Sequence, residues 1–205
     1  MLTTDYETPL WHDFAAVCGI DEAGRGPLAG PVVAAAVVLP RFFVPAGILE
    51  RLNDSKKLAA ELREALAPAI ESASVDWAFG MADEETIDRI NIFQATMLAM
   101  NRAVAALKRR PEFLLVDGNR FSPAMPVMYR TVVQGDSNVF SIAAASVLAK
   151  TRRDSMMKEY GKRYPQYGFE RHFGYPTPEH VAAIARHGRC EIHRKSFRLR
   201  KLGET

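Results

Sequence analysis

The segment from Gly19 to Pro27 constrains the fold more than any other, with the sequence Gly-Ile-Asp-Glu-Ala-Gly-Arg-Gly-Pro. An apolar run over residues 15–20 leads into it and predicts a buried strand. Two adjacent carboxylates, Asp21 and Glu22, end the run, although carboxylates are rarely buried without a partner. Because neighbouring carboxylates repel each other, a divalent cation is the expected partner. The segment therefore predicts a metal site at the end of a core strand.

A glycine–arginine–glycine turn follows the two acids at once. Gly24 and Gly26 allow the backbone to approach a ligand closely, and Arg25 supplies a planar guanidinium that suits phosphate. The turn predicts a phosphate or sugar site beside the metal.

Composition limits the class of protein. The chain has 205 residues, of which 48% are hydrophobic, so one sizeable domain with a real core is expected. No apolar run reaches the roughly 18 residues of a membrane span, and the N-terminus does not resemble a secretory signal. Two distant cysteines favour free thiols in a reducing compartment. We therefore expect a cytoplasmic protein with no membrane partner.

Charge is distributed unevenly along the chain. Residues 150–201 contain 14 Lys or Arg against 5 Asp or Glu, whereas the remainder contains 13 against 19. An acidic part that holds cations, next to a basic part that holds a polyanion, explains this asymmetry. Ordinary solvated helix faces are the alternative explanation.

Hydrophobic patterning predicts strands over residues 15–20, 31–39, 76–81, 112–117 and 128–133. It predicts helices over residues 58–72, 92–107 and 141–160, and one that starts at Thr177-Pro178 and ends at Gly188. Residues 53–55 are the expected cap of the first helix, and either Asp83 or Asn91 could start the second. The short link between the first two strands favours an antiparallel hairpin.

The order of these elements predicts a mixed α/β sheet with helices on its faces. We expect a catalytic core over residues 15–160 and a basic, helical C-terminal extension over residues 161–205 that packs on the core.

Acidic residues end segments at three separate places: Asp21-Glu22, Asp117 and Asp136. Taken singly, each has a plainer explanation, namely surface charge, a turn and a helix start. Ligands of open α/β sheets gather at strand ends, so the acids can meet if their strands are neighbours. Together they suit Mg²⁺ or Mn²⁺, which prefer oxygen ligands.

Strand geometry complicates this picture, because adjacent residues of a strand point to opposite faces. For Asp21 and Glu22 to share an ion, we expect the strand to end at or before Glu22, or Glu22 to lie in a turned backbone.

The whole set of motifs resembles the ribonuclease HII family of bacteria. The matching blocks run in order over residues 19–33, 54–58, 116–118, 135–136, 141–150, 153–154, 164–169, 172, 174–175 and 193–197. The resemblance implies a ribonuclease H-like fold with a C-terminal helical extension. It also implies hydrolysis of the RNA strand of RNA/DNA hybrids, and incision of duplex DNA at single ribonucleotides.

The resemblance further implies two Mn²⁺ or Mg²⁺ ions with substrate bound, and products with 5′-phosphate and 3′-hydroxyl ends. The metal-binding and catalytic residues would be Asp21, Glu22, Asp117 and Asp136. The substrate-binding residues would be Gly24, Arg25, Gly26, Lys56, Lys57 and Tyr175. The glycine–arginine–glycine turn would hold the ribonucleotide and its 2′-hydroxyl. The tyrosine would lie against the sugar at the RNA-to-DNA step, and one of the two lysines would contact a phosphate. The protein would act as a monomer.

Three positions depart from the family pattern. Lysine is common where this chain has Phe173 and Gln134, and glycine is common where it has Pro176. The lysine replaced by Phe173 would contact a phosphate, so position 173 is not part of the predicted site. All four acids are present, so activity is expected.

Two other functions deserve comparison. The first is a nucleotide-binding enzyme that uses residues 24–30 as a phosphate loop, but the glycine spacing fits no common fingerprint. A non-enzymatic binder of RNA/DNA hybrids is the second alternative. No histidine pair has the spacing of a zinc helix, so His172 and His193 are predicted to be structural or phosphate-side groups.

Overall fold

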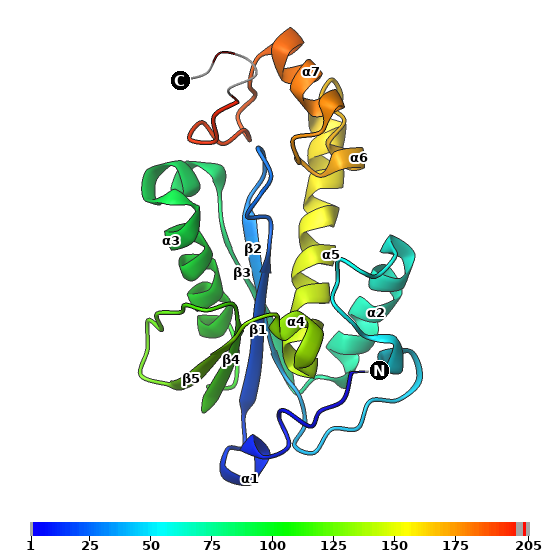
Figure 1. The fold of residues 1–205 in the computed structure, drawn as a ribbon, viewed down its shortest axis with the longest axis vertical. Helices are drawn as coiled ribbons and strands as arrows, with labels where there is room; N and C mark the ends of the chain where they lie inside the picture. Colours follow the sequence, from blue (N-terminus) through cyan, green and yellow to red (C-terminus); the bar gives the residue numbers. More distant parts are fainter. Residues whose placement is uncertain (1, 200–202, 204–205) are drawn as a thin grey trace.

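A five-stranded mixed sheet lies at the centre of the computed structural model, which describes residues 2–199 and 203. The strands are β1 (Val17–Ala23), β2 (Val32–Val38), β3 (Asp76–Ala82), β4 (Phe113–Asp117) and β5 (Met128–Val132). They lie in the order β3-β2-β1-β4-β5 (Figure 1). β1, β2 and β3 pair antiparallel, whereas β4 is parallel to both β1 and β5. All five predicted strands and the predicted hairpin are present.

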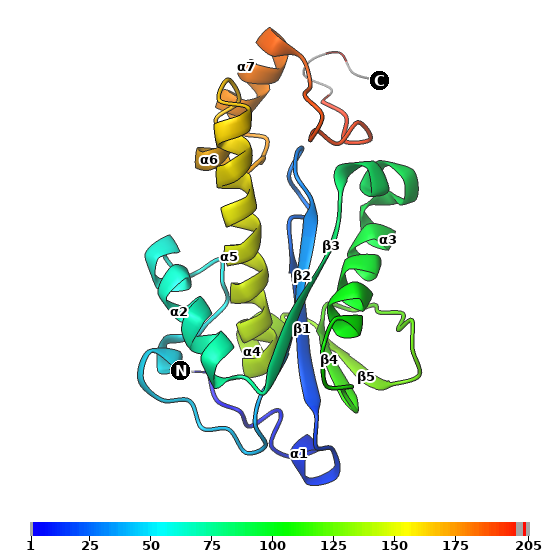
Figure 2. The same cartoon turned by 180° about the vertical axis from the view of Figure 1, so that it is seen from behind.

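Helices cover both faces of the sheet. The long helix α5 (Phe140–Arg163) and α2 (Ala60–Ala73) lie on one face, and α3 (Glu84–Ala105) lies on the other (Figures 1 and 2). The shorter elements are α1 (Leu10–Asp13), the 3₁₀ helix η1 (Gly47–Arg51), α4 (Gly135–Asn138), α6 (Phe169–His172) and α7 (Pro178–His187). None of the described helices is long and apolar enough to cross a membrane.

Small residues bring α5 unusually close to β1. A Cβ atom at Gly19 would lie 2.6 Å from the backbone nitrogen of Ile142, so only glycine fits there. Three consecutive alanines, Ala143 to Ala145, are fully buried in the same contact. This tight packing places the first turns of α5 against β1, close to its acidic end.

One predicted helix cap is wrong, and the two alternative starts of the second helix are both present. Residues 53–55 do not cap α2, which begins after Ala59 without a side-chain cap. Instead the Ser55 hydroxyl lies 2.8 Å from the Ser146 hydroxyl, so this segment is a loop docked on α5. Both candidate starts of the second helix are real. Asp83 caps α3 by accepting from the Thr86 N–H at 2.9 Å, and Asn91 interrupts it with a φ of 66°.

The C-terminal part forms its own small core at the far end of α5 (Figure 1). Tyr167 and Phe169 are buried there with their ring centroids 5.3 Å apart, so these aromatic side chains belong to packing. Thr177 caps α7 and Gly188 ends it, as predicted. The division at residue 160 stays a prediction, and α5 runs across it. Residues 200–202 and 204–205 of the predicted extension lie outside the described residues.

Candidate active site

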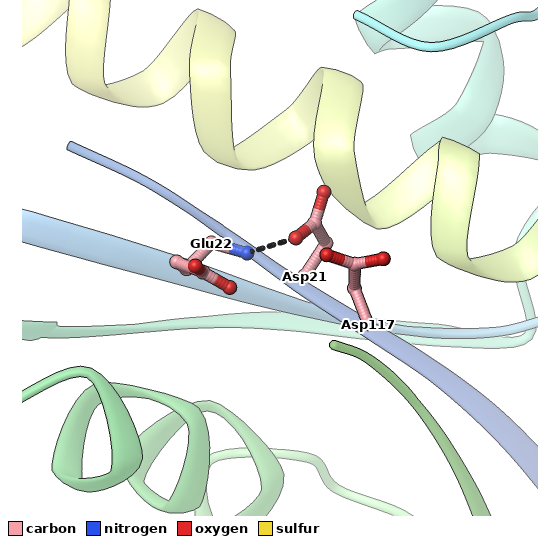
Figure 3. A group of neighbouring side chains, drawn as sticks. All are labelled: Asp21, Glu22 and Asp117. Carbon is pink, nitrogen blue, oxygen red and sulfur yellow. Dashed lines mark hydrogen bonds between the residues drawn. The ribbon is translucent and has the colours of Figure 1, made fainter. Parts of the chain in front are cut away.

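Two of the predicted acids meet because their strands are parallel neighbours. Ile20 pairs with Val116, so Asp21 and Asp117 follow side by side at the ends of β1 and β4. Residues in register on neighbouring strands share a face, and both carboxylates point towards α5 (Figure 3). Ser146 of α5 lies beside Asp21, and its side chain lowers the pKa of the Asp21 carboxyl against the larger effect of burial.

Glu22 reaches the same point although its backbone is still part of the regular strand β1. The prediction that β1 ends at or before Glu22, or turns there, is wrong, since β1 continues to Ala23 and Glu22 pairs with Ala34. Glu22 starts from the opposite face of the strand (Figure 3). β4 ends at Asp117, which leaves one edge of β1 open beyond Ile20. The longer glutamate side chain can therefore come round this open edge.

Ligand oxygens of Asp21, Glu22 and Asp117 all lie within 4.8 Å of one another. Burial raises the pKa of all three carboxyls, and their mutual charge raises it further for Asp21 and Glu22. Asp136 adds to the rise in the pKa of Asp117. Three carboxyls this close cannot all ionise easily, because their negative charges repel one another. A bound divalent cation would offset this repulsion, and it prefers carboxylate oxygens as ligands. The residues present therefore fit Mg²⁺ or Mn²⁺.

Asp136 is near this group but is not a member of it. Its backbone lies at the start of α4, where Gly135 N–H donates to Asp117 Oδ1 at 2.7 Å. Its own carboxylate accepts from Lys56 Nζ at 3.2 Å and is not among the ligand oxygens that lie within 4.8 Å of one another. Gln134, with a φ of 56°, makes the left-handed turn that starts α4. The structure thus brings together three of the four predicted ligands.

The two candidate lysines differ in position. Lys56 lines the cavity of the acids, and burial lowers its pKa, but the bond and charge of Asp136 outweigh this and raise the pKa overall. Lys57 turns aside, with its Nζ 3.7 Å from Asp54 and 3.4 Å from the Ser137 hydroxyl. Lys56 is therefore the better placed phosphate contact.

A cavity of about 590 Å³ joins the acids to the predicted substrate residues. Its lining includes the three acids and also Gly24, Arg25, Gly26, Lys56 and Tyr175. Arg25 leans back towards Glu22, with 3.4 Å between its Nη1 and the carboxylate. A Cβ at Gly26 would lie 3.7 Å from the Tyr175 ring, so the turn and the tyrosine are close neighbours.

Buried histidines hold the backbone around Tyr175. His180 Nδ1 donates to the Tyr175 carbonyl at 2.9 Å, and His193 Nε2 lies 3.1 Å from His180 Nε2. His172 stacks on His180 with 4.4 Å between ring centroids and accepts from the Gly174 N–H. Of the two roles predicted for His172 and His193, these buried contacts favour the structural one.

Sequence reasoning missed several residues of the site. Ser146 lines the same cavity as Asp21, and Lys150 lies 5.0 Å from the centre of the Phe173 ring and 5.8 Å from the centre of the Tyr175 ring. Arg153 and Arg194 were counted with the basic surface but are fully buried. No signal in the sequence separates a buried arginine from a surface one, because only tertiary packing decides it.

Two ribonucleases H of known structure have a similar fold. The ribonuclease H2 from Pyrococcus horikoshii OT3 superposes with a TM-score of 0.73 at 23% identity, over 91% of this chain and 96% of that one. Bst-RNase HIII in complex with Mn²⁺ gives 0.74 at 22% identity, over 94% and 70%. The fold thus defines a ribonuclease H-like protein, which confirms the predicted fold class.

Sequence comparisons narrow this class to one family. A family model described as Ribonuclease HII matches residues 18–200. The protein named Ribonuclease HII in Chlorobaculum parvum is 70% identical over 204 residues, covering 100% of both chains. This chain therefore belongs to the ribonuclease HII family and is a ribonuclease H enzyme, which sets aside both alternative functions.

Proposed function

We propose that this enzyme hydrolyses the RNA strand of RNA/DNA hybrids and also incises duplex DNA at single ribonucleotides. The cleavage would leave 5′-phosphate and 3′-hydroxyl ends. The observation that carries the proposal is the joint lining of one cavity by three clustered acids and the Gly24-Arg25-Gly26 turn. One wall thus suits cations, and the adjoining wall offers backbone and guanidinium donors to a nucleotide.

The acids have the role of metal ligands in this proposal. Asp21, Glu22 and Asp117 would hold Mg²⁺ or Mn²⁺, and Asp136 would join them once Lys56 moves towards a phosphate. Two bound ions would supply Lewis acidity and an activated water at neutral pH. Ser146, whose side chain lowers the pKa of Asp21, would help to orient that carboxylate, and the pairing of β1 with β4 would fix the spacing of Asp21 and Asp117.

The neighbouring groups would select and place the substrate. The backbone at Gly24 and Gly26 is open to the cavity and is suited to reach a 2′-hydroxyl, which distinguishes RNA from DNA locally. Tyr175 is 41% exposed at the cavity rim, where its ring can pack on a sugar. Lys56, and less directly Lys57, would contact a phosphate.

Three labelled duplexes test the proposal in the presence of Mg²⁺ or Mn²⁺: an RNA/DNA hybrid, a DNA duplex with one ribonucleotide, and the same duplex without it. We expect cleavage of the first two only. The 3′ ends of the products should be extended directly by a DNA polymerase. Cleavage of the all-DNA duplex, or an intact single-ribonucleotide duplex, would contradict the proposed specificity.

We further propose that the enzyme is a cytoplasmic monomer. Its two cysteines, Cys18 and Cys190, are free, which fits a reducing compartment. Sedimentation equilibrium of the purified protein would reveal a dimer if this is wrong.

A further inference from the structure

Arg194 is fully buried, and its guanidinium contacts the backbone of the Gly24-Arg25-Gly26 turn, called the substrate turn below. Its Nη1 donates to the Arg25 carbonyl at 3.1 Å, and its Nη2 donates to the Gly24 carbonyl at 2.5 Å. Its Nε and Nη2 both donate to the Gly30 carbonyl, at 2.9 and 2.7 Å. One guanidinium thus binds both ends of the loop that carries the glycine–arginine–glycine turn.

This charge is held by carbonyl oxygens. Among the described residues, Arg194 forms no ion pair within 4.0 Å, and neither does its buried neighbour Arg153. Burial, together with the charge of Arg153, lowers the pKa of Arg194 to about 9, so the group stays charged at neutral pH. Burying a cation without a carboxylate is unfavourable for stability, which indicates that the site serves another requirement.

The hydrogen bonds of Arg194 fix which way the peptide groups of the turn face. In a trans peptide the C=O and the following N–H point in opposite directions. Because the carbonyls of Gly24 and Arg25 point at Arg194, the N–H groups of Arg25 and Gly26 point away from it. Neither N–H has a hydrogen-bond partner among the described residues, and both residues line the cavity.

We infer that Arg194 is a positioning residue, which locks the substrate turn so that two free backbone N–H groups face the nucleotide. The inference rests on the proposed function, because it deepens the role of the Gly24-Arg25-Gly26 turn. Arg194 acts through this backbone and does not itself reach the cavity.

A second set of contacts holds Arg194 in place. Asp88 of α3 accepts from the N–H groups of Lys195 and Ser196, both at 2.8 Å. The Ser196 hydroxyl donates to the same carboxylate at 2.6 Å. The Arg194 N–H also donates to the Leu28 carbonyl at 2.8 Å. The segment that carries Arg194 is therefore fastened to both α3 and the loop, so Asp88 offers a distant means of loosening it.

Arg194→Lys tests the inference, because lysine keeps the charge but has one nitrogen in place of the three that bind the loop. Arg186→Lys is the matched control, an exposed arginine in the last turn of α7. Two readouts are measured: single-turnover cleavage with Mn²⁺, and metal-free binding to a single-ribonucleotide duplex and to its all-DNA counterpart by fluorescence anisotropy.

We expect Arg194→Lys to slow cleavage by roughly 10- to 100-fold, as misplacement of positioning groups does. We also expect it to bind both duplexes with nearly equal affinity, whereas the wild type and Arg186→Lys prefer the ribonucleotide. A purely structural role would lower the folded fraction and leave the affinity ratio unchanged, and that result would overturn the inference.

If Arg194→Lys does not fold, Asp88→Ala is the second test. We expect it to lower the ratio of affinities for the single-ribonucleotide duplex and the all-DNA duplex in the same way. An unchanged ratio in Asp88→Ala would then overturn the inference. Failure of the proposed function is recognised separately, because the wild type itself would leave the single-ribonucleotide duplex uncut. A wild type that binds both duplexes equally would overturn the positioning role even if it cleaves.

Discussion

Lys56 Nζ lies 3.2 Å from Oδ2 of Asp136, so the fourth predicted metal ligand forms an ion pair with a lysine. The negative charge of Asp21 also raises the pKa of Lys56. A positive charge next to a cluster of acids opposes the entry of cations and favours the entry of a phosphate. If Asp136 binds metal and Lys56 binds a phosphate, as proposed, we expect this pair to couple the two binding events.

The Lys56→Met substitution should strengthen Mn²⁺ binding to the substrate-free protein. A unit charge at about 4 Å contributes about 1 kcal/mol in water, so we expect an affinity gain of about fivefold. Isothermal titration calorimetry measures it. Lys57→Met is the control, because Lys57 faces Asp54 and does not line the cavity. Equal effects of the two variants would contradict the role given to Lys56.

Asp21→Asn should abolish turnover and yet stabilise the metal-free protein. Burial and the charges of Glu22 and Asp117 raise the pKa of Asp21 well above its usual value. Between the unfolded and folded pKa values the folded protein binds more protons, so its stability falls as the pH rises through that window. Asparagine removes this penalty while keeping an oxygen for the Glu22 N–H.

Thermal melts in a chelator should therefore show a higher Tm for Asp21→Asn than for the wild type at neutral pH, and a smaller difference in acid. Addition of Mn²⁺ should raise the Tm of the wild type only, because a ligand stabilises the state that binds it. Turnover should fall by at least about 100-fold, as when a key electrostatic group is lost. A variant that cleaves normally would refute the assignment of Asp21.

Acid should loosen the C-terminal part through His180. Burial lowers the pKa of His180 to about 4, and the charge of His172 contributes to this. As the pH falls from 6.5 towards 4, the unfolded chain gains a proton that the folded protein resists, so stability declines over that window. The His180→Gln variant should show a flatter decline in urea unfolding between about pH 7 and pH 5. The exposed His187 on the same helix is the control site, and His187→Gln should follow the wild type.

Gly24→Ala should reduce stability as well as activity. Gly24 has a φ of +101°, and an added Cβ would lie 2.6 Å from Arg153 Cδ and 2.7 Å from the Pro31 carbonyl. The Arg153 guanidinium would have to leave the carbonyls that it binds, at Ala29, Pro31 and Phe173. We expect a loss of about 1–3 kcal/mol in the free energy of unfolding, measured by urea titration, which is the range for backbone strain at a functional site. Gly118→Ala, at the same φ but with open space around it, separates the strain from the clash.

Local patterning predicted the elements well because its causes are local. β2, for example, is a continuous run of seven small or branched apolar residues, and all seven are buried. The cap and stop of α7 at Thr177 and Gly188 depend only on adjacent residues. The cap expected at residues 53–55 does not form. The Ser55 hydroxyl is instead hydrogen-bonded to that of Ser146, which is distant in the sequence.

The sequence by itself determined the strands, most of the helices, the family and three acids that meet. These follow from residue chemistry and short-range geometry, and Asp21 and Asp117 needed only parallel neighbouring strands to come together. Tertiary structure alone decided that Glu22 reaches the cluster round an open strand edge, that Asp136 faces Lys56, and that Arg194 supports the substrate turn from within. Those outcomes depend on contacts between residues up to 170 positions apart, and the burial that creates them exists only once the chain has packed.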